Sequence, residues 1–320
     1  MALSRREFLG AAALGPLAVK ALGDSPLPTR DFGRTGVKVP ILAFGCGSRY
    51  MAYEDDDEAV AVLGRAIDLG ITYLDTAHSY GNGRSEERVG RLMATRRKEV
   101  LLQTKLGARK GDDARRQLEL SLKRLKTDHL DVLHVHSLES LDDLAAVEAK
   151  DGVLRVVMEA RDQKVTRFAG ITGHADPASM KVALERHDFD CVQMALNVAR
   201  ARMQFDASGP NPVKMAEASY EALALPVAAA KGMGVIAMKV FGQDRLIGEA
   251  PPEKLLYYAL SLPVSLATVG MPKPELLDRN VQLARSFEPL PDPEMRRLRA
   301  SVGEARRTAL ARFFRDHRDA

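Results

Sequence analysis

The stretch TYLDTAHSYGNGRSEERVGRLMAT, residues 72–95, holds one complete strand–turn–helix unit. It begins with a short apolar run typical of a buried strand, passes through a Gly-rich turn, and continues with charged and apolar residues at helical spacing. The strand-like run ends on Asp75, and the turn carries His78 and Tyr80. A carboxylate, an imidazole and a phenol at the end of an apolar strand need a reason, because buried polar groups are costly unless they are bonded.

The same alternation of strand and helix continues along the chain. Eight strand-like runs can be counted: ILAFG (41–45), TYLDT (72–76), VLLQTKL (100–106), HLDVLHVH (129–136), TRFAGITG (166–173), CVQMALN (191–197), GVIAMKV (234–240) and SLATVGM (265–271). Eight βα units favour a closed α/β barrel, a (β/α)8 TIM barrel in a single domain. An open doubly wound sheet usually has fewer strands and a GxGxxG turn, which FGCGSR (44–49) lacks. We expect the barrel over residues 24–290 and a helical tail over 291–320.

The composition is that of an ordinary globular protein. Of the 320 residues, 46% are apolar and 28% are charged, which argues against disorder of the bulk of the chain. The formal charge of +4 is spread out, with no interleaved aromatic and basic residues, so we expect no nucleic-acid partner. The two cysteines, Cys46 and Cys191, lie in strand-like runs and are expected to be buried free thiols.

The first residues differ from the rest of the chain. SRREFLG (4–10) and AAALGPLAV (11–19) place paired arginines before a short apolar run. That run is shorter than the roughly 20 residues of a membrane-spanning helix, so we expect no stable membrane span. Residues 1–23 resemble a twin-arginine signal peptide, the alternative being an ordinary basic helix. The resemblance implies the twin-arginine export machinery as a partner and a periplasmic location; without a working signal the protein would stay cytoplasmic.

Four polar residues are expected to meet at one end of the barrel. Asp75 ends the second strand-like run, Lys105 nearly ends the third and His136 ends the fourth, while Tyr80 follows Asp75 in its loop. The C-terminal ends of barrel strands form the functional mouth. Lys105, paired with Asp75, could ease loss of the Tyr80 proton, and His136 could orient a carbonyl oxygen. Each residue alone could be structural, but their joint placement favours an acid–base site.

His134 and His136 form an H-x-H pair, which is a possible metal motif because alternate strand residues point the same way. Metal-dependent barrel hydrolases usually carry this pair on the first strand, whereas here it lies on the fourth. The last strand-like run, followed by Pro272 and Lys273, offers no acidic ligand. We therefore expect no metal, and interpret His134 as a hydrogen-bonded interior residue.

Several stretches together resemble the aldo-keto reductases in order, spacing and content over roughly residues 29–285. The most specific are the D-T-A-x-x-Y-G element at 75–81 and the L-K-R-L-x-T-D-x-L-D-x-x-x-x-H element at 122–136. The resemblance implies a (β/α)8 barrel that uses NADPH to reduce carbonyls by hydride transfer. Carried over position by position, it places the catalytic tetrad on Asp75, Tyr80, Lys105 and His136.

The resemblance also implies where the cofactor lies. The positions matching its cofactor contacts are Gly45, Thr172, Gln193, Lys239, Val240, Phe241, Lys273 and Asn280. Three positions of the phosphate-binding loop depart from the family pattern, namely Gly270, Met271 and Leu276, and Lys273 is the evident cation left there. One lysine is a thinner anchor for a 2′-phosphate than a lysine with an arginine. NADP(H) remains the preferred cofactor, with NAD(H) possible.

The expected function is NAD(P)H-dependent reduction of an aldehyde or ketone to an alcohol, with Tyr80 as general acid and a small-molecule carbonyl as substrate. The alternative is a nucleotide-binding barrel without efficient turnover, acting as a redox sensor or partner subunit. Substrate identity does not follow from the sequence, because the loops that form the substrate wall vary without altering the barrel.

Overall fold

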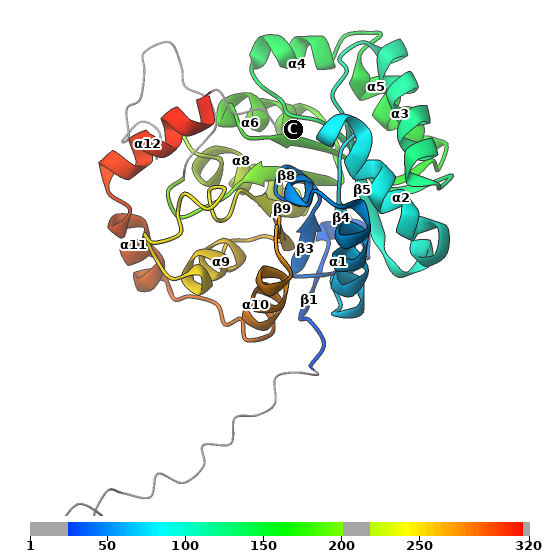
Figure 1. The fold of residues 1–320 in the computed structure, drawn as a ribbon. Helices are drawn as coiled ribbons and strands as arrows, with labels where there is room; N and C mark the ends of the chain where they lie inside the picture. Colours follow the sequence, from blue (N-terminus) through cyan, green and yellow to red (C-terminus); the bar gives the residue numbers. More distant parts are fainter. Residues whose placement is uncertain (1–24, 201–217, 316–320) are drawn as a thin grey trace, which may run out of the picture.

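The computed structural model describes residues 25–200 and 218–315, so the twin-arginine-like segment lies outside the described residues. Eight parallel strands close into a barrel in the order β10-β3-β4-β5-β6-β7-β8-β9 (Figure 1). They are β3 Leu42–Gly45, β4 Tyr73–Asp75, β5 Leu101–Leu106, β6 Leu130–Val135, β7 Thr166–Gly173, β8 Cys191–Ala195, β9 Gly234–Met238 and β10 Leu266–Val269. Each strand lies within one of the eight predicted runs, and the single-domain (β/α)8 barrel is confirmed.

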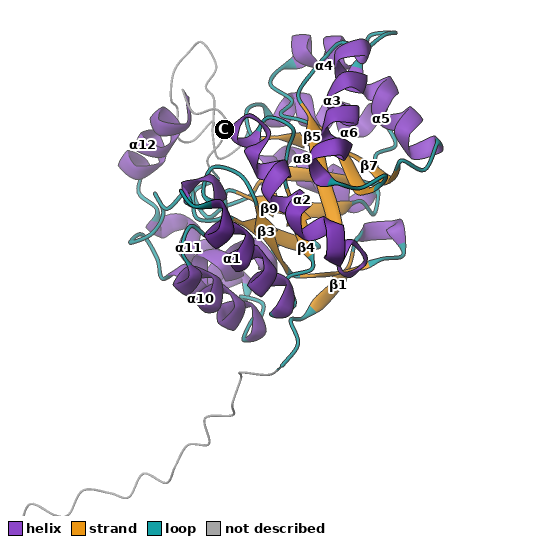
Figure 2. Ribbon diagram, turned by 45° about the vertical axis from the view of Figure 1, so that its right-hand side comes forward, coloured by secondary structure: helices purple, strands orange, loops and turns teal. Residues whose placement is uncertain are grey.

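Helices surround the barrel (Figure 2). They are α1 Asp56–Asp68, α2 Arg84–Arg96, α3 Gly111–Leu125, α4 Leu141–Val147, α5 Val153–Asp162, α6 Pro177–Arg186, α8 Tyr220–Ala230, α9 Pro252–Ser261, α10 Pro274–Arg285, α11 Asp292–Ser301 and α12 Glu304–Arg315. Local sequence explains where they start. At α1 the Asp55 carboxylate accepts a hydrogen bond from the Glu58 amide at 2.8 Å, and acidic residues fill the first turn. Both features stabilise a helix N-terminus.

A short hairpin, which was not predicted, precedes the barrel. β1 (Thr29–Asp31) pairs antiparallel with β2 (Lys38–Pro40). Between them Phe32 is 1% exposed and packs edge-on against Tyr73 and Phe168, at 5.8 and 6.2 Å between ring centroids. A side chain on Gly234, the first residue of β9, would lie 2.6 Å from the Phe32 ring. Aromatic side chains thus fill the N-terminal end of the barrel.

The C-terminal helix α12 packs beside the loop that follows β9. Arg306 of α12 donates to the Glu249 carboxylate at 2.6 Å, and the Arg245 guanidinium lies 4.1 Å from the centre of the Phe313 ring. Leu310 of α12 is buried. The tail therefore supports this loop from outside.

Both cysteines are free and buried, as predicted. His134 Nε2 lies 3.2 Å from Cys191 Sγ inside the barrel. Burial lowers the pKa of His134 well below its usual value and raises the pKa of the Cys191 thiol. The pair is therefore neutral, and His134 is an interior hydrogen-bonding residue.

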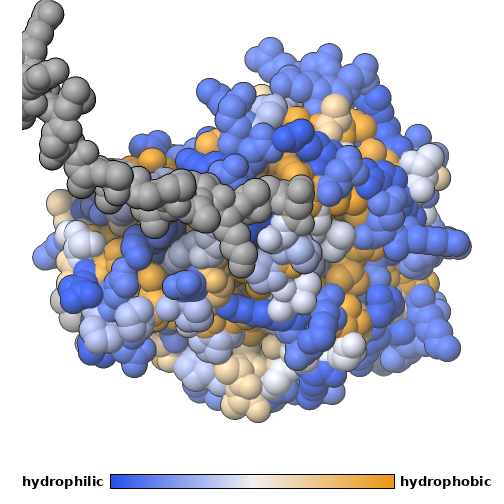
Figure 3. Space-filling model, turned by 90° about the horizontal axis from the view of Figure 1, so that it is seen from below, coloured by the Kyte–Doolittle hydropathy of each residue, from blue (hydrophilic) through white to orange (hydrophobic). Residues whose placement is uncertain are grey.

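On the outside, hydrophilic residues surround scattered hydrophobic ones on the face in Figure 3, as on most globular proteins.

Candidate active site

Asp75 and Lys105 form an ion pair at the C-terminal ends of β4 and β5. The Lys105 ammonium donates to Asp75 Oδ1, to the Thr76 carbonyl oxygen at 2.9 Å and to the Tyr80 hydroxyl oxygen at 3.0 Å. Asp75 is 3% exposed and Lys105 is 1% exposed. Since buried charges are tolerated only when paired and hydrogen-bonded, this pair is fully engaged. The Tyr80 hydroxyl accepts from the ammonium, so its own proton points away from Lys105.

Tyr80 and His136 lie side by side at the same end of the barrel. His136 directly follows β6, and its ring centroid is 5.7 Å from that of Tyr80, with the rings edge to face at 78°. Both side chains are buried. Tyr80 opens the short turn η4 (Tyr80–Gly83), in which Gly81 and Asn82 have φ of 57° and 55°. The structure thus brings together the four residues that the sequence predicted for catalysis.

A partly buried arginine and a buried glutamate together hold the loop that carries Tyr80. Arg124 of α3 donates to the carbonyl oxygens of His78 and Asn82 at 3.2 and 3.3 Å, and its guanidinium lies 3.3 Å from the Glu86 carboxylate. Glu86 is fully buried and also accepts from Thr104 at 2.7 Å. The backbone is therefore fixed on both sides of Tyr80. The sequence did not indicate this pair, because charged residues on helices usually face solvent.

The Asp75 carboxylate accepts three further hydrogen bonds from uncharged side chains. Gln103 donates to Oδ1 at 2.7 Å, and Gln193 and Thr268 donate to Oδ2 at 2.6 and 3.1 Å. Gln103 and Thr268 were not predicted as site residues. Gln103 stands two positions before Lys105, so strand alternation places both on the same face of β5.

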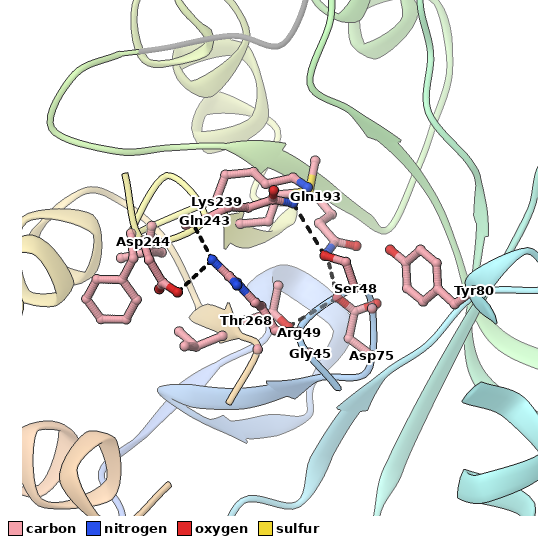
Figure 4. A pocket seen from close by; sticks show the side chains of 16 residues that line it. Gly45, Ser48, Arg49, Asp75, Tyr80, Gln193, Lys239, Gln243, Asp244 and Thr268 are labelled. Carbon is pink, nitrogen blue, oxygen red and sulfur yellow. Dashed lines mark hydrogen bonds and ion pairs between the residues drawn. The ribbon is translucent and has the colours of Figure 1, made fainter. Parts of the chain in front are cut away.

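A pocket opens above these residues, at the C-terminal end of the barrel (Figure 4). Its floor includes Asp75, Tyr80 and Gln193. The pocket is lined by Gly45, Gly47, Ser48, Arg49, Asp75, Tyr80, Gln193, Met238, Lys239, Val240, Phe241, Gln243, Asp244, Thr268, Val269 and Gly270. Tyr80 thus lies at the junction between the ion pair and an accessible cavity.

Arg49 links the loop after β3 to the loop after β9, and both loops line this pocket. It follows β3, and its guanidinium donates to the Gln243 carbonyl oxygen at 2.7 Å and pairs with the Asp244 carboxylate at 2.6 Å (Figure 4). Gln243 and Asp244 have φ of 52° and 68°, a conformation that few non-glycine residues adopt. Arg49 therefore stabilises a loop shape that costs backbone energy.

The family model described as "Aldo/keto reductase family" matches residues 42–253. This match covers most of the barrel and more than half of the chain. The chain belongs to the aldo/keto reductase family. The predicted resemblance is confirmed for the barrel, and the match does not reach the N-terminal segment.

Relatives of this aldo/keto reductase include L-galactose dehydrogenase of Arabidopsis thaliana, 28% identical over 238 residues, with 70% of this chain and 68% of the relative covered. D-threo-aldose 1-dehydrogenase of a Pseudomonas species is 29% identical over 284 residues, with 78% and 77% covered. Among solved structures, the holo form of an aldo-keto reductase from Bacillus halodurans matches with a TM-score of 0.69 and 22% identity, covering 87% of this chain and 97% of the other. At that identity the structural match shows the fold alone.

The predicted cofactor residues of this aldo/keto reductase fall into two groups. Those that line the pocket are Gly45, Gln193, Lys239, Val240 and Phe241. Thr172, Lys273 and Asn280 do not line it. Thr172 Oγ1 accepts from the Ser137 amide at 2.8 Å and so holds the loop after β6.

The other two residues that do not line the pocket, Lys273 and Asn280, lie at and within α10. Lys273 is exposed and directly precedes this helix. Asn280 is buried within it and accepts from the neighbouring Arg279 at 3.2 Å. Arg279 is a cation within α10 that the sequence did not single out.

Glycines, a glutamine and an aromatic side chain line the pocket at the strand ends. Gly270 lacks a side chain where a Cβ would lie 2.6 Å from the Arg49 side chain, and a Cβ on Gly45 would lie 3.2 Å from the Gly270 amide. These glycines let the Arg49 side chain and the backbone after β10 lie close to the strand ends. Gln193 presents an amide to the pocket, and Phe241 adds an aromatic ring that is 7% exposed. The residues present fit a nicotinamide cofactor.

Two further findings concern the part of the chain that the structure describes. Within residues 25–200 and 218–315, no three His, Cys, Asp or Glu side chains are grouped so that they could hold a metal ion. Over the same residues, no helix is long and apolar enough to cross a membrane.

Proposed function

We propose that this protein is an NAD(P)H-dependent reductase that converts an aldehyde or ketone to an alcohol, with Tyr80 as general acid. The observation that supports this most is the 3.0 Å contact between the Lys105 ammonium and the Tyr80 hydroxyl, beside the Asp75 carboxylate at the floor of the pocket. A phenol beside a buried cation can release its proton more readily than a phenol in water, because the cation stabilises the tyrosinate.

In this proposal the four residues at the mouth of the barrel each have a defined part in the reaction. The bound cofactor would supply the hydride to the carbonyl carbon. Tyr80 gives its proton to the carbonyl oxygen, and Lys105 stabilises the negative charge left on the phenol. Asp75 holds Lys105 in place, and His136, edge to face with Tyr80, orients the carbonyl oxygen.

Two binding titrations and a substrate panel test this proposal. NADPH and NADH are each titrated into the purified protein, with the nicotinamide fluorescence as readout, and carbonyl compounds are then supplied. The panel includes aldoses, because two relatives are named as dehydrogenases of L-galactose and of D-threo-aldoses. Oxidation of the aldoses is tested with NADP+ and NAD+ in the same way. Cofactor binding without reduction of any panel member by NAD(P)H, or oxidation of any by NAD(P)+, would favour the alternative, a nucleotide-binding barrel without efficient turnover.

The cofactor preference depends on the cations in and directly before α10. We propose NADP(H) as the preferred cofactor, with Lys273 contacting the 2′-phosphate. Lys273→Ala should then weaken NADPH binding about 1 to 3 kcal/mol more than NADH binding, the range of a charge-assisted hydrogen bond. The matched variant Arg279→Ala removes the neighbouring cation. If only Arg279→Ala discriminates between the cofactors, Arg279 carries the contact instead of Lys273.

We also propose export to the periplasm, on the basis of Arg5 and Arg6 before the mildly apolar run 8–19. A protein that loads a dinucleotide in the cytoplasm must cross the membrane folded, which the twin-arginine route permits. Replacing both arginines with lysine should leave a full-length, folded precursor in the cytoplasm, whereas the unaltered protein is recovered outside the inner membrane in shortened form. Finding the unaltered protein cytoplasmic with residues 1–23 retained would contradict export and leave the oxidoreductase proposal intact.

A further inference from the structure

A continuous chain of hydrogen bonds runs through the barrel interior to Asp75. The Tyr73 hydroxyl donates to Gln103 Oε1 at 2.5 Å. Gln103 Nε2 donates both to Asp75 Oδ1, at 2.7 Å, and to Gln193 Oε1, at 2.8 Å. Gln193 Nε2 in turn donates to Asp75 Oδ2 at 2.6 Å. All four side chains are nearly or fully buried, so water does not replace these bonds.

Donors and acceptors in this series of hydrogen bonds can be assigned in only one way. An ionised carboxylate only accepts hydrogen bonds, so both glutamines must turn their NH2 groups toward Asp75. Gln103 uses its two N–H donors on Asp75 and Gln193, which leaves its oxygen for the Tyr73 hydroxyl. Burial raises the pKa of Tyr73 well above its usual value, so the hydroxyl stays protonated and remains a donor. Gln103 is therefore fully engaged, with no alternative orientation that keeps every bond.

The same chain determines how Asp75 meets Lys105. Asp75 receives Gln103 and Lys105 on one oxygen and Gln193 and Thr268 on the other, which matches the roughly four lone-pair sites of a carboxylate. Rotation of the carboxylate would break several of these bonds. A fixed carboxylate fixes the Lys105 ammonium, and the ammonium contacts the Tyr80 hydroxyl.

We infer that Gln103 is a positioning residue, which holds Asp75 so that Lys105 faces Tyr80 and which orients the Gln193 amide at the pocket floor. The inference rests on the proposed reductase function, and it adds a residue that touches neither pocket nor substrate in that role. Gln103 joins the proton-donor side of the site to a residue that lines the cofactor pocket. A glutamine that merely filled the barrel would not influence either side.

The test compares Gln103→Met with a control variant at an equally buried position, Cys191→Ala. Met keeps the length of the side chain but donates nothing to Asp75. Cys191 lies on β8 two positions before Gln193, and Cys191→Ala removes the buried hydrogen-bond partner of His134. It removes no hydrogen bond to Asp75. We expect Gln103→Met to lower kcat about 10- to 100-fold with little change in the carbonyl KM, the size of effect that small misplacements of catalytic groups produce. Cys191→Ala should leave kcat within about twofold.

A second variant, Gln103→Glu, gives a readout that a structural role would not produce. Two carboxyl groups that share a site cannot both ionise easily. While the introduced carboxyl is protonated it still donates one hydrogen bond, but once it ionises it repels Asp75. Activity of Gln103→Glu should therefore fall with rising pH over a range in which the unaltered protein shows no such loss.

A third readout does not depend on a carbonyl substrate. The ultraviolet titration of Tyr80 is isolated as the difference between proteins with and without Tyr80→Phe, in each background. In Gln103→Met its midpoint should rise, because Lys105 is no longer held against the hydroxyl, and in Cys191→Ala it should not. If the midpoint and kcat of Gln103→Met match those of Cys191→Ala, the positioning role is wrong. If the unaltered protein reduces no carbonyl, the proposed function fails, while the tyrosine titration still decides the role of Gln103.

Discussion

Tyr80→Phe should lower kcat/KM for carbonyl reduction by about 100-fold or more, because it removes the general acid and keeps the aromatic ring. The ring packs within 3.4 Å of the position that a Cβ on Gly47 would take, and phenylalanine preserves that packing. Cofactor affinity, measured by fluorescence titration, should therefore change little. The measurement is a steady-state assay with the best carbonyl found in the substrate panel.

Tyr257→Phe is the matched control for this variant. Tyr257 also loses a hydroxyl that donates a hydrogen bond, to the Leu283 carbonyl oxygen at 2.9 Å, but it lies on α9 and does not line the pocket. Its activity should stay near that of the unaltered protein. Near-normal activity of Tyr80→Phe would instead show that the proton comes from another group, and His136 would be the next candidate.

Lys105→Met should reduce kcat by at least about 100-fold and also destabilise the fold. The methionine cannot stabilise a tyrosinate, and it leaves the buried Asp75 carboxylate without its cation. Breaking a buried ion pair by removing one partner typically costs about 3 to 5 kcal/mol in the free energy of unfolding. Activity and urea denaturation of the same preparation measure the two losses.

A double variant separates these two effects. Adding Asp75→Asn to Lys105→Met removes the unpaired charge, so it should recover much of the lost stability and none of the activity. Lys231→Met serves as the control, since the Lys231 ammonium donates to the backbone carbonyls of residues 184, 185 and 187, none of which lines the pocket. If the double variant regained activity together with stability, Lys105 would be only a structural partner of Asp75.

The barrel and the four central residues could be predicted because their signals are local and regular. The eight strands are short apolar runs between amphipathic helices, and parallel strands buried on both faces must be apolar along their whole length. The rule that strand C-termini face the mouth then brings Asp75, Tyr80, Lys105 and His136 together before any contact is known. Regular topology thus converts positions in the chain into positions in space.

Tertiary structure decided the contacts that surround these residues. Gln103 meets Gln193, 90 positions further on, and Arg49 meets Gln243, 194 positions further on. No periodic pattern marks such pairs, because which buried polar group receives which partner depends on packing between strands and loops. The hairpin β1–β2 escaped prediction for a related reason, since three-residue strands are too short for a periodic signal.

The sequence by itself therefore determined the fold class and the residues around which chemistry is expected. Only the folded chain decided how those residues are held. The sequence predicted that Asp75 pairs with Lys105. Its three uncharged donors, Gln103, Gln193 and Thr268, are seen only in the folded structure. The physical reason is that a buried carboxylate must have its hydrogen bonds satisfied. The residues that donate them come from strands that lie far apart in the sequence and meet only in the closed barrel.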